Sequence, residues 1–236
     1  DLYCLVPRAS SVMSKRQRLS TTFKIVSECA SAGTGVKLIG THDGTFHCDE
    51  AMGCAMLQML PEFAGSTIVR TRNLDELAKC DIVIDVGAVY DHATKRYDHH
   101  QRTFTSVLGD EHPDVPADAR PDFQTKLSAC GLVYKHYGLG ALLPVLTSGT
   151  AIPESLLPTI YKKIYKGFIE EIDAIDNGVD IAGDAPLKYK ISTNLSARVG
   201  HLNPAWNEDG SKERRNELFR DAMELTAHEL QASVQR

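Results

Sequence analysis

The sequence predicts an α/β fold built on a mostly parallel sheet flanked by helices. Short runs that favour β-structure alternate with segments of helical periodicity from residue 36 onward, which is the pattern of consecutive β-α units. The run DIVIDVG at 81–87 is apolar enough to be buried on both faces, as strands of parallel sheets are. The helical segment 47–60 separates the first two strands and is stopped by Pro61.

The predicted strands are short runs rich in β-branched and apolar residues. They are VKLIG (36–40), STIVRT (66–71), DIVIDVG (81–87) and KRYDHH (95–100). Because helices connect parallel strands, the carboxyl ends of these strands are expected at one edge of the sheet. The stretch 187–199 is open between strand and loop, and the polar segment 101–123 is predicted to be a long loop.

Helical periodicity and capping signals define the helices. They are predicted at 47–60, 73–80, 125–138, 153–176 and 211–236. Asn73 and Glu76 form a capping-box pattern at the start of the second helix, and Gly138 is placed to end the third. The segment 153–176 is one helix or two, interrupted near Pro158, and the last helix has no stop signal.

The composition is that of a globular protein. Hydrophobic residues make up 42% and charged residues 24% of the chain, and no apolar run approaches the roughly 18 residues that cross a bilayer. The net charge of −5 excludes a polycation that coats nucleic acid along its whole length. Six cysteines without C-x-x-C spacing argue against a zinc knuckle or a disulfide framework and suit a reducing compartment.

We divide the sequence into three parts. Residues 1–35 are predicted to be a disordered or targeting extension outside the fold. They resemble a mitochondrial transit segment, SKRQR at 14–18 could be a nuclear signal, and a tail without an address is equally open. Residues 36–210 are predicted to form the catalytic domain. Residues 211–236 are predicted to be a C-terminal helix that starts a linker or a second domain, most of which this sequence lacks.

Histidines and aspartates gather where the predicted strands end. They are His42, His47 and Asp49 after the first strand, Asp85 at the end of the third, Asp98, His99 and His100 at the end of the fourth, and Asp173 or Asp176 after the long helical stretch. Alone, Asp85 could be a turn former, Asp49 an N-cap, and His42 and His47 loop residues. A buried, unpaired Asp85 would be costly, however, and a cation would remove that cost.

Imidazole and carboxylate ligands without cysteine suit Mn²⁺, Mg²⁺ or Fe²⁺ better than a structural zinc. Six of these residues are candidate ligands: His42, His47, Asp49, Asp85, His99 and one late aspartate. Six protein ligands are too many for one catalytic ion that keeps open positions. They suit two ions that share a bridging carboxylate, an arrangement that hydrolyses phosphoesters. We therefore expect two divalent cations, Mn²⁺ first and Mg²⁺ as the alternative.

Several long motifs resemble a known family. They are THDGTFHCDEA, IVRTRN, DIVIDVG, YDHHQRTF, QTKLSACGLVY, AIDNG and LSARVGHLNPAWN. The sequence DHH at 98–100, with Asp85 and the cluster at 42–49, is similar to the DHH phosphoesterase superfamily. The longer motifs resemble the melanocyte proliferating gene 1 family over about residues 36–234. The resemblance implies a DHH phosphoesterase-like fold in residues 36–210, and a metal-dependent hydrolase that acts as a 3′–5′ RNA exonuclease of nucleus and mitochondria.

The resemblance also implies roles for individual residues. It assigns a first ion to His42, His47 and Asp85. It assigns a second ion to Asp49, Asp85, His99 and Asp176, with Asp85 bridging. Asp176 is preferred to Asp173 because DNG is similar to the D-x-G of the superfamily.

The substrate side of the site is implied in the same way. His100 would face the substrate phosphate as a hydrogen-bond donor or general acid, and Asp98 would orient the histidines. Arg102, Lys126 and Arg198 lie in family-like motifs and are candidates for phosphate contacts, although each could be a solvated charge or part of a salt bridge. Phe46, Phe104 and Trp206 could stack on bases, although core packing is the more ordinary role for such residues.

We expect a two-metal phosphodiesterase that trims single-stranded RNA from its 3′ end and releases nucleoside 5′-monophosphates. The ligand pattern alone indicates phosphoester hydrolysis, and only the resemblance indicates RNA. Two alternatives stay open. One is a small-molecule phosphohydrolase acting on pyrophosphate or (cyclic) dinucleotides, which the net charge of −5 favours slightly. The other is a non-catalytic module stabilised by metal. We expect no membrane partner. We expect the protein to be localised in the mitochondrial matrix, the nucleus or both, and otherwise in the cytoplasm. The oligomeric state is not indicated.

Overall fold

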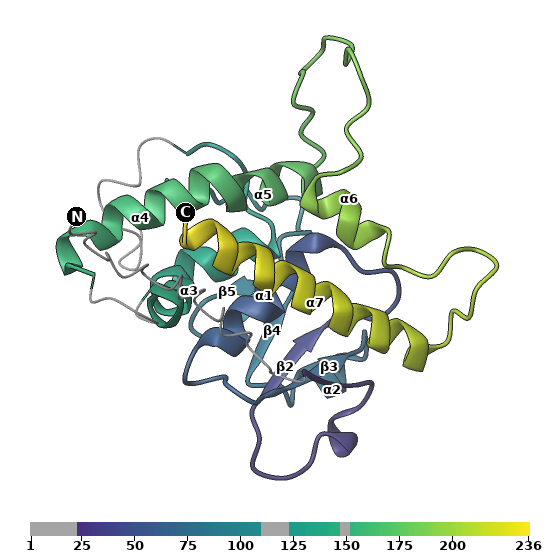
Figure 1. Ribbon diagram of the computed structural model, residues 1–236. Coiled ribbons are helices and arrows are strands. Elements are labelled where there is room, and N and C mark those ends of the chain that lie inside the picture. The colour runs from purple at the N-terminus through teal and green to yellow at the C-terminus, as the bar shows by residue number, and fades with distance from the viewer. Residues whose placement is uncertain (1–22, 110–122, 147–151) are drawn as a thin grey trace, which may run out of the picture.

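The computed structural model describes residues 23–109, 123–146 and 152–236. It confirms the predicted α/β class, with a six-stranded, mostly parallel sheet flanked by helices (Figure 1). The strands are β1 Lys24–Val26, β2 Leu38–Thr41, β3 Thr67–Arg70, β4 Ile82–Ile84, β5 Tyr90–Asp91 and β6 Arg96–Tyr97. Their order across the sheet is β1-β3-β2-β4-β6-β5, and within it only the pairing of β5 with β6 is antiparallel.

Helices and short helical turns make up about half of the other described residues. They are η1 Cys29–Ser31, α1 Cys48–Met59, α2 Leu74–Leu77, α3 Ala129–Leu146, η3 Glu154–Leu156, α4 Leu157–Ile164, the π-turn η4 Tyr165–Ile169, α5 Glu170–Asp176, α6 Leu195–Gly200 and α7 Lys212–Val234. In the described part of the chain, no helix combines the length and apolar character needed to span a membrane.

Both faces of the sheet are covered by apolar side chains. Ile39 and Ile68 belong to the larger core, which also holds the buried sides of α1, α3 and α7. Val69 and Val83 point to the opposite face and pack with Leu77 of α2 in a smaller core. Successive strand residues point to opposite faces, so a strand buried on both sides is an unbroken apolar run. This is why DIVIDVG could be recognised in the sequence.

The chain reverses its direction of travel across the sheet at β3. Helix α1 connects β2 to β3 on one side, and α2 connects β3 to β4 on the other side of β2. Right-handed crossovers that run in opposite directions place their helices on opposite faces. The carboxyl ends of β2 and β4 therefore flank a topological switch point, the usual place for a site in an open parallel sheet.

The predicted boundary at residue 35 is wrong for the first strand. Residues 24–26 form β1, which pairs in parallel with β3, and Phe23 lies in the larger core. A strand this short carries too little periodicity to be recognised. The remainder of the predicted extension, residues 1–22, lies outside the described residues.

Several predicted elements differ in detail. Helix α3 does not end at Gly138 but continues to Leu146. Pro158 lies in the first turn of α4, where its missing N–H costs little, and the irregularity in the long helical stretch is instead the π-turn η4. The end of the ambiguous stretch 187–199 is neither strand nor loop, because α6 starts there. Most of the predicted loop 101–123 lies outside the described residues.

Helix α7 is part of the same fold. Ser211 is its N-cap and accepts a hydrogen bond from the Arg214 backbone N–H at 3.2 Å. Phe219, Met223 and Leu230 are buried in the larger core, and α7 packs across α1 (Figure 1). That the helix leads on to a linker or a second domain stays a prediction.

Gly138 is expected to be required for the packing of α3. A Cβ at this position would lie 2.9 Å from Tyr161 Cε2 and 3.1 Å from Tyr134 Cδ2. These two rings are buried and stacked, and each hydroxyl donates to the other residue's carbonyl, so they have little room to move. Gly138→Ala should lower the free energy of unfolding by about 1–3 kcal/mol in urea titrations.

Gly167→Ala is the matched control, because no atom lies within 4 Å of an added Cβ there. It should leave stability unchanged or raise it slightly, because alanine is the better helix former. Equal effects of the two substitutions would contradict the packing role of Gly138.

Candidate metal centre

Three neighbouring strands deliver the candidate side chains to one edge of the sheet. Strands β2, β4 and β6 are adjacent and parallel, so their carboxyl ends lie side by side. His42 follows β2, Asp85 follows β4, and the segment 98–100 follows β6. The structure thus brings together residues that the sequence analysis grouped by strand end.

Asp85 lies at the centre of the cluster. Its Oδ2 is 3.2 Å from His42 Nε2, and its Oδ1 is 3.4 Å from His99 Nε2. Its φ angle of 56° is left-handed, which is uncommon outside glycine, and Gly87 and Ala88 continue the turn with φ of 99° and 56°. Such strain persists where the surroundings hold a side chain in a required direction. Here the turn aims the Asp85 carboxylate between two imidazoles.

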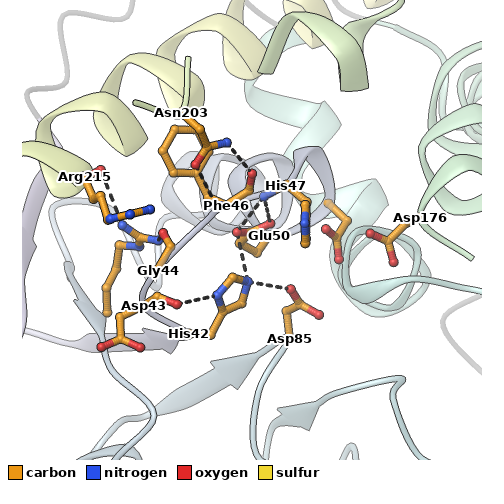
Figure 2. A network of polar contacts seen from close by, with 12 residues as sticks. His42, Asp43, Gly44, Phe46, His47, Glu50, Asp85, Asp176, Asn203 and Arg215 are labelled. Atoms are coloured by element: carbon orange, nitrogen blue, oxygen red, sulfur yellow. Dashed lines mark hydrogen bonds and ion pairs between the residues drawn. The ribbon is translucent and has the colours of Figure 1, made fainter. Parts of the chain in front are cut away.

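The start of α1 contributes another imidazole and two carboxylates. His47 is the N-cap, and Glu50 accepts hydrogen bonds from the His47 backbone N–H at 2.9 Å. Glu50 Oε1 also lies 3.1 Å from His42 Nε2 (Figure 2). Asp49 is buried inside the first helical turn. The alternative interpretation of Asp49 as the N-cap is therefore wrong.

No role was predicted for Glu50 from the sequence. This carboxylate is fully buried, and with His42 and His47 it forms a group whose ligand atoms lie within 4.8 Å of one another. One signal could have identified it. His47 and Glu50 have the same capping-box spacing as Asn73 and Glu76, but histidine is not among the usual N-cap residues.

Of the two late aspartates, Asp176 is the one that reaches the cluster. It is the last residue of α5, and its Oδ2 lies 3.1 Å from His99 Nε2. It also forms a group with His47 and Asp49 whose ligand atoms lie within 4.8 Å of one another. The choice of Asp176 over Asp173 agrees with this geometry, and its role as a ligand stays a prediction.

Asp173 has a structural role instead. It is buried and accepts hydrogen bonds from Ser128 N at 3.0 Å, Ser128 Oγ at 2.7 Å and Tyr165 Oη at 2.9 Å. A side chain at Gly131 would collide with its carboxylate, so only glycine allows this approach. Asp173 thereby ties the start of α3 to the π-turn and α5.

Among the described residues, five of the buried polar atoms that have no hydrogen-bond partner belong to this cluster. They are Asp49 Oδ1 and Oδ2, Asp85 Oδ1, and His99 Nδ1 and Nε2. Burial, followed by repulsion from Asp85 and Asp176, raises the pKa of Asp49 well above its ordinary value. Leaving one buried acceptor unsatisfied costs about 1–3 kcal/mol, and more for a charged group.

The positive charge of protonated imidazoles partly compensates the negative charge of these carboxylates. Burial lowers the pKa of His42, but contacts with Asp85 and Glu50 outweigh it and raise the value to about 10. Burial likewise lowers the pKa of His99, but Asp176 and Asp85 raise it to about 9. Both histidines thus favour the imidazolium form beside their carboxylates. A cation that bound there would have to displace those protons, because a metal ligand must be neutral imidazole.

The residues present fit divalent cations. Each unsatisfied atom is a carboxylate oxygen or an imidazole nitrogen, and the four candidate groups in the described residues contain no cysteine. A cation among them would satisfy the oxygens and remove the repulsion between the carboxylates at the same time. Hard oxygen donors with imidazole favour Mn²⁺ or Mg²⁺ over a structural zinc.

His99 and His100 have different environments. The His99 side chain is buried, whereas 62% of the His100 side chain is exposed. Asp98 Oδ1 lies 2.7 Å from His100 Nδ1, and Asp98 Oδ2 accepts from the Ala88 N–H at 2.6 Å. The contact with Asp98 raises the pKa of His100. Asp98 therefore orients His100 and anchors the turn after Asp85.

A pocket of about 470 Å³ adjoins the cluster. Its lining includes His47, Asp49 and Asp176 together with the apolar side chains of Ile172, Ile175 and Ile191. The pocket therefore joins charged groups to an apolar surface.

The three candidates for phosphate contact differ in their surroundings. Arg102 is exposed after β6. Lys126 Nζ lies 5.5 Å from the ring centroid of Phe104. Arg198 pairs with Glu229 of α7 at 2.8 Å. This contact matches the alternative that Arg198 is part of a salt bridge. Of the three, Arg198 is thus already paired.

The three candidates for base stacking differ in their exposure to solvent. Phe46 and Phe104 are buried in the core, whereas Trp206 is 97% exposed. Core packing is thus the role of the first two. Of these three residues, Trp206 alone has a ring that is open to a ligand.

The C-terminal part of the chain holds the loop between β2 and α1. Asn203 accepts from the Phe46 N–H at 3.0 Å and donates from Nδ2 to the Phe46 carbonyl at 2.8 Å (Figure 2). The buried Arg70 donates from Nη2 to the Gly44 carbonyl at 3.0 Å, and its guanidinium lies 4.4 Å from the Phe219 ring of α7. The sequence offered no signal for these contacts, because both partners are distant along the chain.

Comparisons with known proteins give one consistent family. The family model MYG1_exonuc, described as "Uncharacterised protein family (UPF0160)", matches residues 38–236. The chain is 49% identical to MYG1 exonuclease of Mus musculus and 47% identical to MYG1 exonuclease of Homo sapiens, in each case over 81% of this chain and 48% of the relative. It is 44% identical to MYG1 protein C27H6.8 of Caenorhabditis elegans, over 84% of this chain and 54% of the relative. The chain thus spans about half the length of these relatives. No solved structure matches it.

Substitution of His99 is expected to weaken metal binding, whereas substitution of His100 is not. His99 is buried, and its Nε2 lies 3.1 Å from Asp176 and 3.4 Å from Asp85. His100 belongs to a candidate group with Asp85 and His99, but its Nδ1 lies 3.6 Å from Asp85 and is engaged by Asp98 at 2.7 Å, and its side chain is largely exposed. In calorimetric titrations with Mn²⁺, His99→Ala should bind at least about tenfold more weakly than wild type. His100→Ala should bind like wild type. Undiminished binding by His99→Ala would contradict its place in the metal centre.

The buried Asp173 is expected to make stability pH-dependent. Burial outweighs its hydrogen bonds and raises its pKa from 3.8 to about 7. Between these values the folded state holds a proton that the unfolded state has lost. The contribution of this proton to the free energy of unfolding is therefore complete below about pH 4 and is lost as the pH rises through 7.

Asp173→Asn should remove this dependence. In urea titrations, wild type should lose stability relative to the variant by up to about 1.4 kcal/mol per pH unit between pH 4 and 7. Parallel curves for the two proteins would show that Asp173 does not titrate in this range.

Proposed function

The chain belongs to the MYG1_exonuc family, and from this premise we propose that it is a metal-dependent phosphodiesterase that trims single-stranded RNA from its 3′ end. The products would be nucleoside 5′-monophosphates. The observation that carries the proposal is the set of buried, unsatisfied carboxylate and imidazole atoms where β2, β4, β6 and α1 meet. Several unsatisfied ionisable groups gathered in one buried space call for an explanation, and a bound cation supplies one.

Two cations are the best match to the number of donors. His42, His47 and Asp85 would hold the first, where His42 contacts Asp85 and the buried Glu50 lies beside both histidines. Asp49, Asp85, His99 and Asp176 would hold the second. Bound divalent cations supply positive charge that stabilises the phosphoryl transition state and lowers the pKa of water. Mn²⁺ is the cation we propose first, and Mg²⁺ the second.

His100 is suited to act on the substrate. Its Nδ1 is engaged by Asp98, and most of the side chain is open to solvent. The other nitrogen, Nε2, is thereby left to donate a hydrogen bond or a proton to the phosphate or to the departing 3′ oxygen. Asp98 would keep the ring in this orientation.

The choice of RNA has separate support. The mammalian relatives bear the name exonuclease, which supports a nuclease. RNA rests on the long motifs over about residues 36–234, which resemble a family of 3′–5′ RNA exonucleases. Because the chain spans about half of those relatives, substrate and direction of cutting are part of the proposal. So is a place in the mitochondrial matrix or the nucleus.

A small-molecule phosphohydrolase is the second candidate. The net charge of −5 favours it, because a long RNA track calls for a basic surface. Release of phosphate from pyrophosphate, or cleavage of dinucleotides without cleavage of longer RNA, would distinguish this function.

The proposal predicts that hydrolysis depends on the charge of Asp85. Asparagine tolerates the left-handed backbone at this position, so Asp85→Asn removes a charge without adding strain. With Mn²⁺ and single-stranded RNA labelled at its 5′ end, wild type should produce a ladder of shortened products. Asp85→Asn should lose at least about a hundredfold in rate.

His100→Ala is the matched variant in this assay. It should bind Mn²⁺ like wild type and still lose turnover, because His100 would act on the substrate and not on the metal. Equal rates for wild type and Asp85→Asn would exclude the proposed mechanism, and phosphate release from pyrophosphate alone would favour the second candidate.

A further inference from the structure

The pocket beside the cluster is larger than a metal centre needs. Its volume is about 470 Å³, whereas a water molecule occupies about 30 Å³ of the liquid. Pockets for small organic ligands measure about 300–1,000 Å³. Room is therefore left beside Asp49 and Asp176 for an organic group.

Part of that room is apolar. Ile172, Ile175 and Ile191 line the pocket, and Ile175 and Ile191 remain 39% and 40% exposed. Large side chains left uncovered beside charged groups favour a ligand with a flat apolar part and an anionic part. A nucleotide has this combination, whereas pyrophosphate has no apolar part.

Ile191 lies near the end of a long loop. This loop, residues 177–194, joins α5 to α6 and projects from the body of the protein (Figure 1). At its start, Asn177 Nδ2 donates to the Lys126 carbonyl at 2.9 Å, and at its end Asn194 Oδ1 accepts from the Ala197 N–H at 2.8 Å. Both ends of the loop are thus anchored by hydrogen bonds, and Ile191 lies close to the anchored end at Asn194.

We propose that this pocket binds the nucleoside of the 3′-terminal nucleotide. The base packs against Ile172, Ile175 and Ile191, and its phosphate lies toward Asp49 and Asp176, where cations would neutralise the carboxylates. The inference rests on the proposed function, because it assumes a phosphodiester at the metal centre. It adds that recognition depends on the nucleoside and not on phosphate alone.

The test compares two ligands that differ by the nucleoside. Binding of AMP and of inorganic phosphate is measured by calorimetry in the presence of Mn²⁺. Wild type should bind AMP at least roughly tenfold more tightly than phosphate, the effect of removing about 60 Å² of apolar surface from water. Ile191→Trp, which fills the pocket, should bring AMP to within about twofold of phosphate.

Ile181→Trp is the matched control. Ile181 lies on the same loop and is 81% exposed, but it is not part of the pocket lining. This variant should keep the preference for AMP, and both variants should bind Mn²⁺ and unfold like wild type.

The inference fails if wild type has no preference for AMP, if Ile191→Trp retains it, or if Ile181→Trp loses it equally. If the preference behaves as expected but RNA is not cut, the proposed exonuclease function fails and the nucleotide pocket stands.

Discussion

The concentration of carboxylates in one buried space is the constraint on which the rest of this structure depends. Asp49, Glu50 and Asp85 lie within 4.8 Å of one another, measured between ligand atoms, and all three are buried. Like charges this close repel strongly where water is scarce. His42 and His99 compensate part of the charge, and the atoms left unsatisfied are those that a divalent cation would bind. The same arrangement that costs folding energy therefore prepares a metal centre.

Distant parts of the chain keep that arrangement in place. Asn203 clamps both backbone groups of Phe46, next to the N-cap of α1, and Arg70 holds the Gly44 carbonyl. Asp98 ties the turn after β4 to His100. The loops that carry the candidate ligands are thus fixed from α7, from β3 and from the segment after α6. Fixing the surroundings of ligands in this way is what limits the motion of a metal centre.

Helix α5 shows how one short element serves two purposes. Asp173 faces the interior and accepts three hydrogen bonds that join α3 to the π-turn, whereas Asp176 faces His99 and the pocket. The hydrogen bonds of Asp173 anchor the helix, and the anchored helix positions Asp176 beside His99. The π-turn just before α5 is consistent with this, because such turns are frequent at functional sites.

The sequence alone was sufficient for the α/β class and for most of the cluster. Apolar runs such as DIVIDVG reveal strands buried on both faces, and polar residues at the ends of parallel strands necessarily meet at one edge of the sheet. It was not sufficient for β1, whose three residues show no pattern, or for Gly138, whose role depends on two tyrosines of different helices. Glu50 and Asn203 were decided only by the tertiary structure. The capping-box spacing marks Glu50 only as a partner of the His47 backbone, and its contact with His42 is seen only in the folded structure. Asn203 meets Phe46 from 157 residues away, so no local pattern can encode that contact.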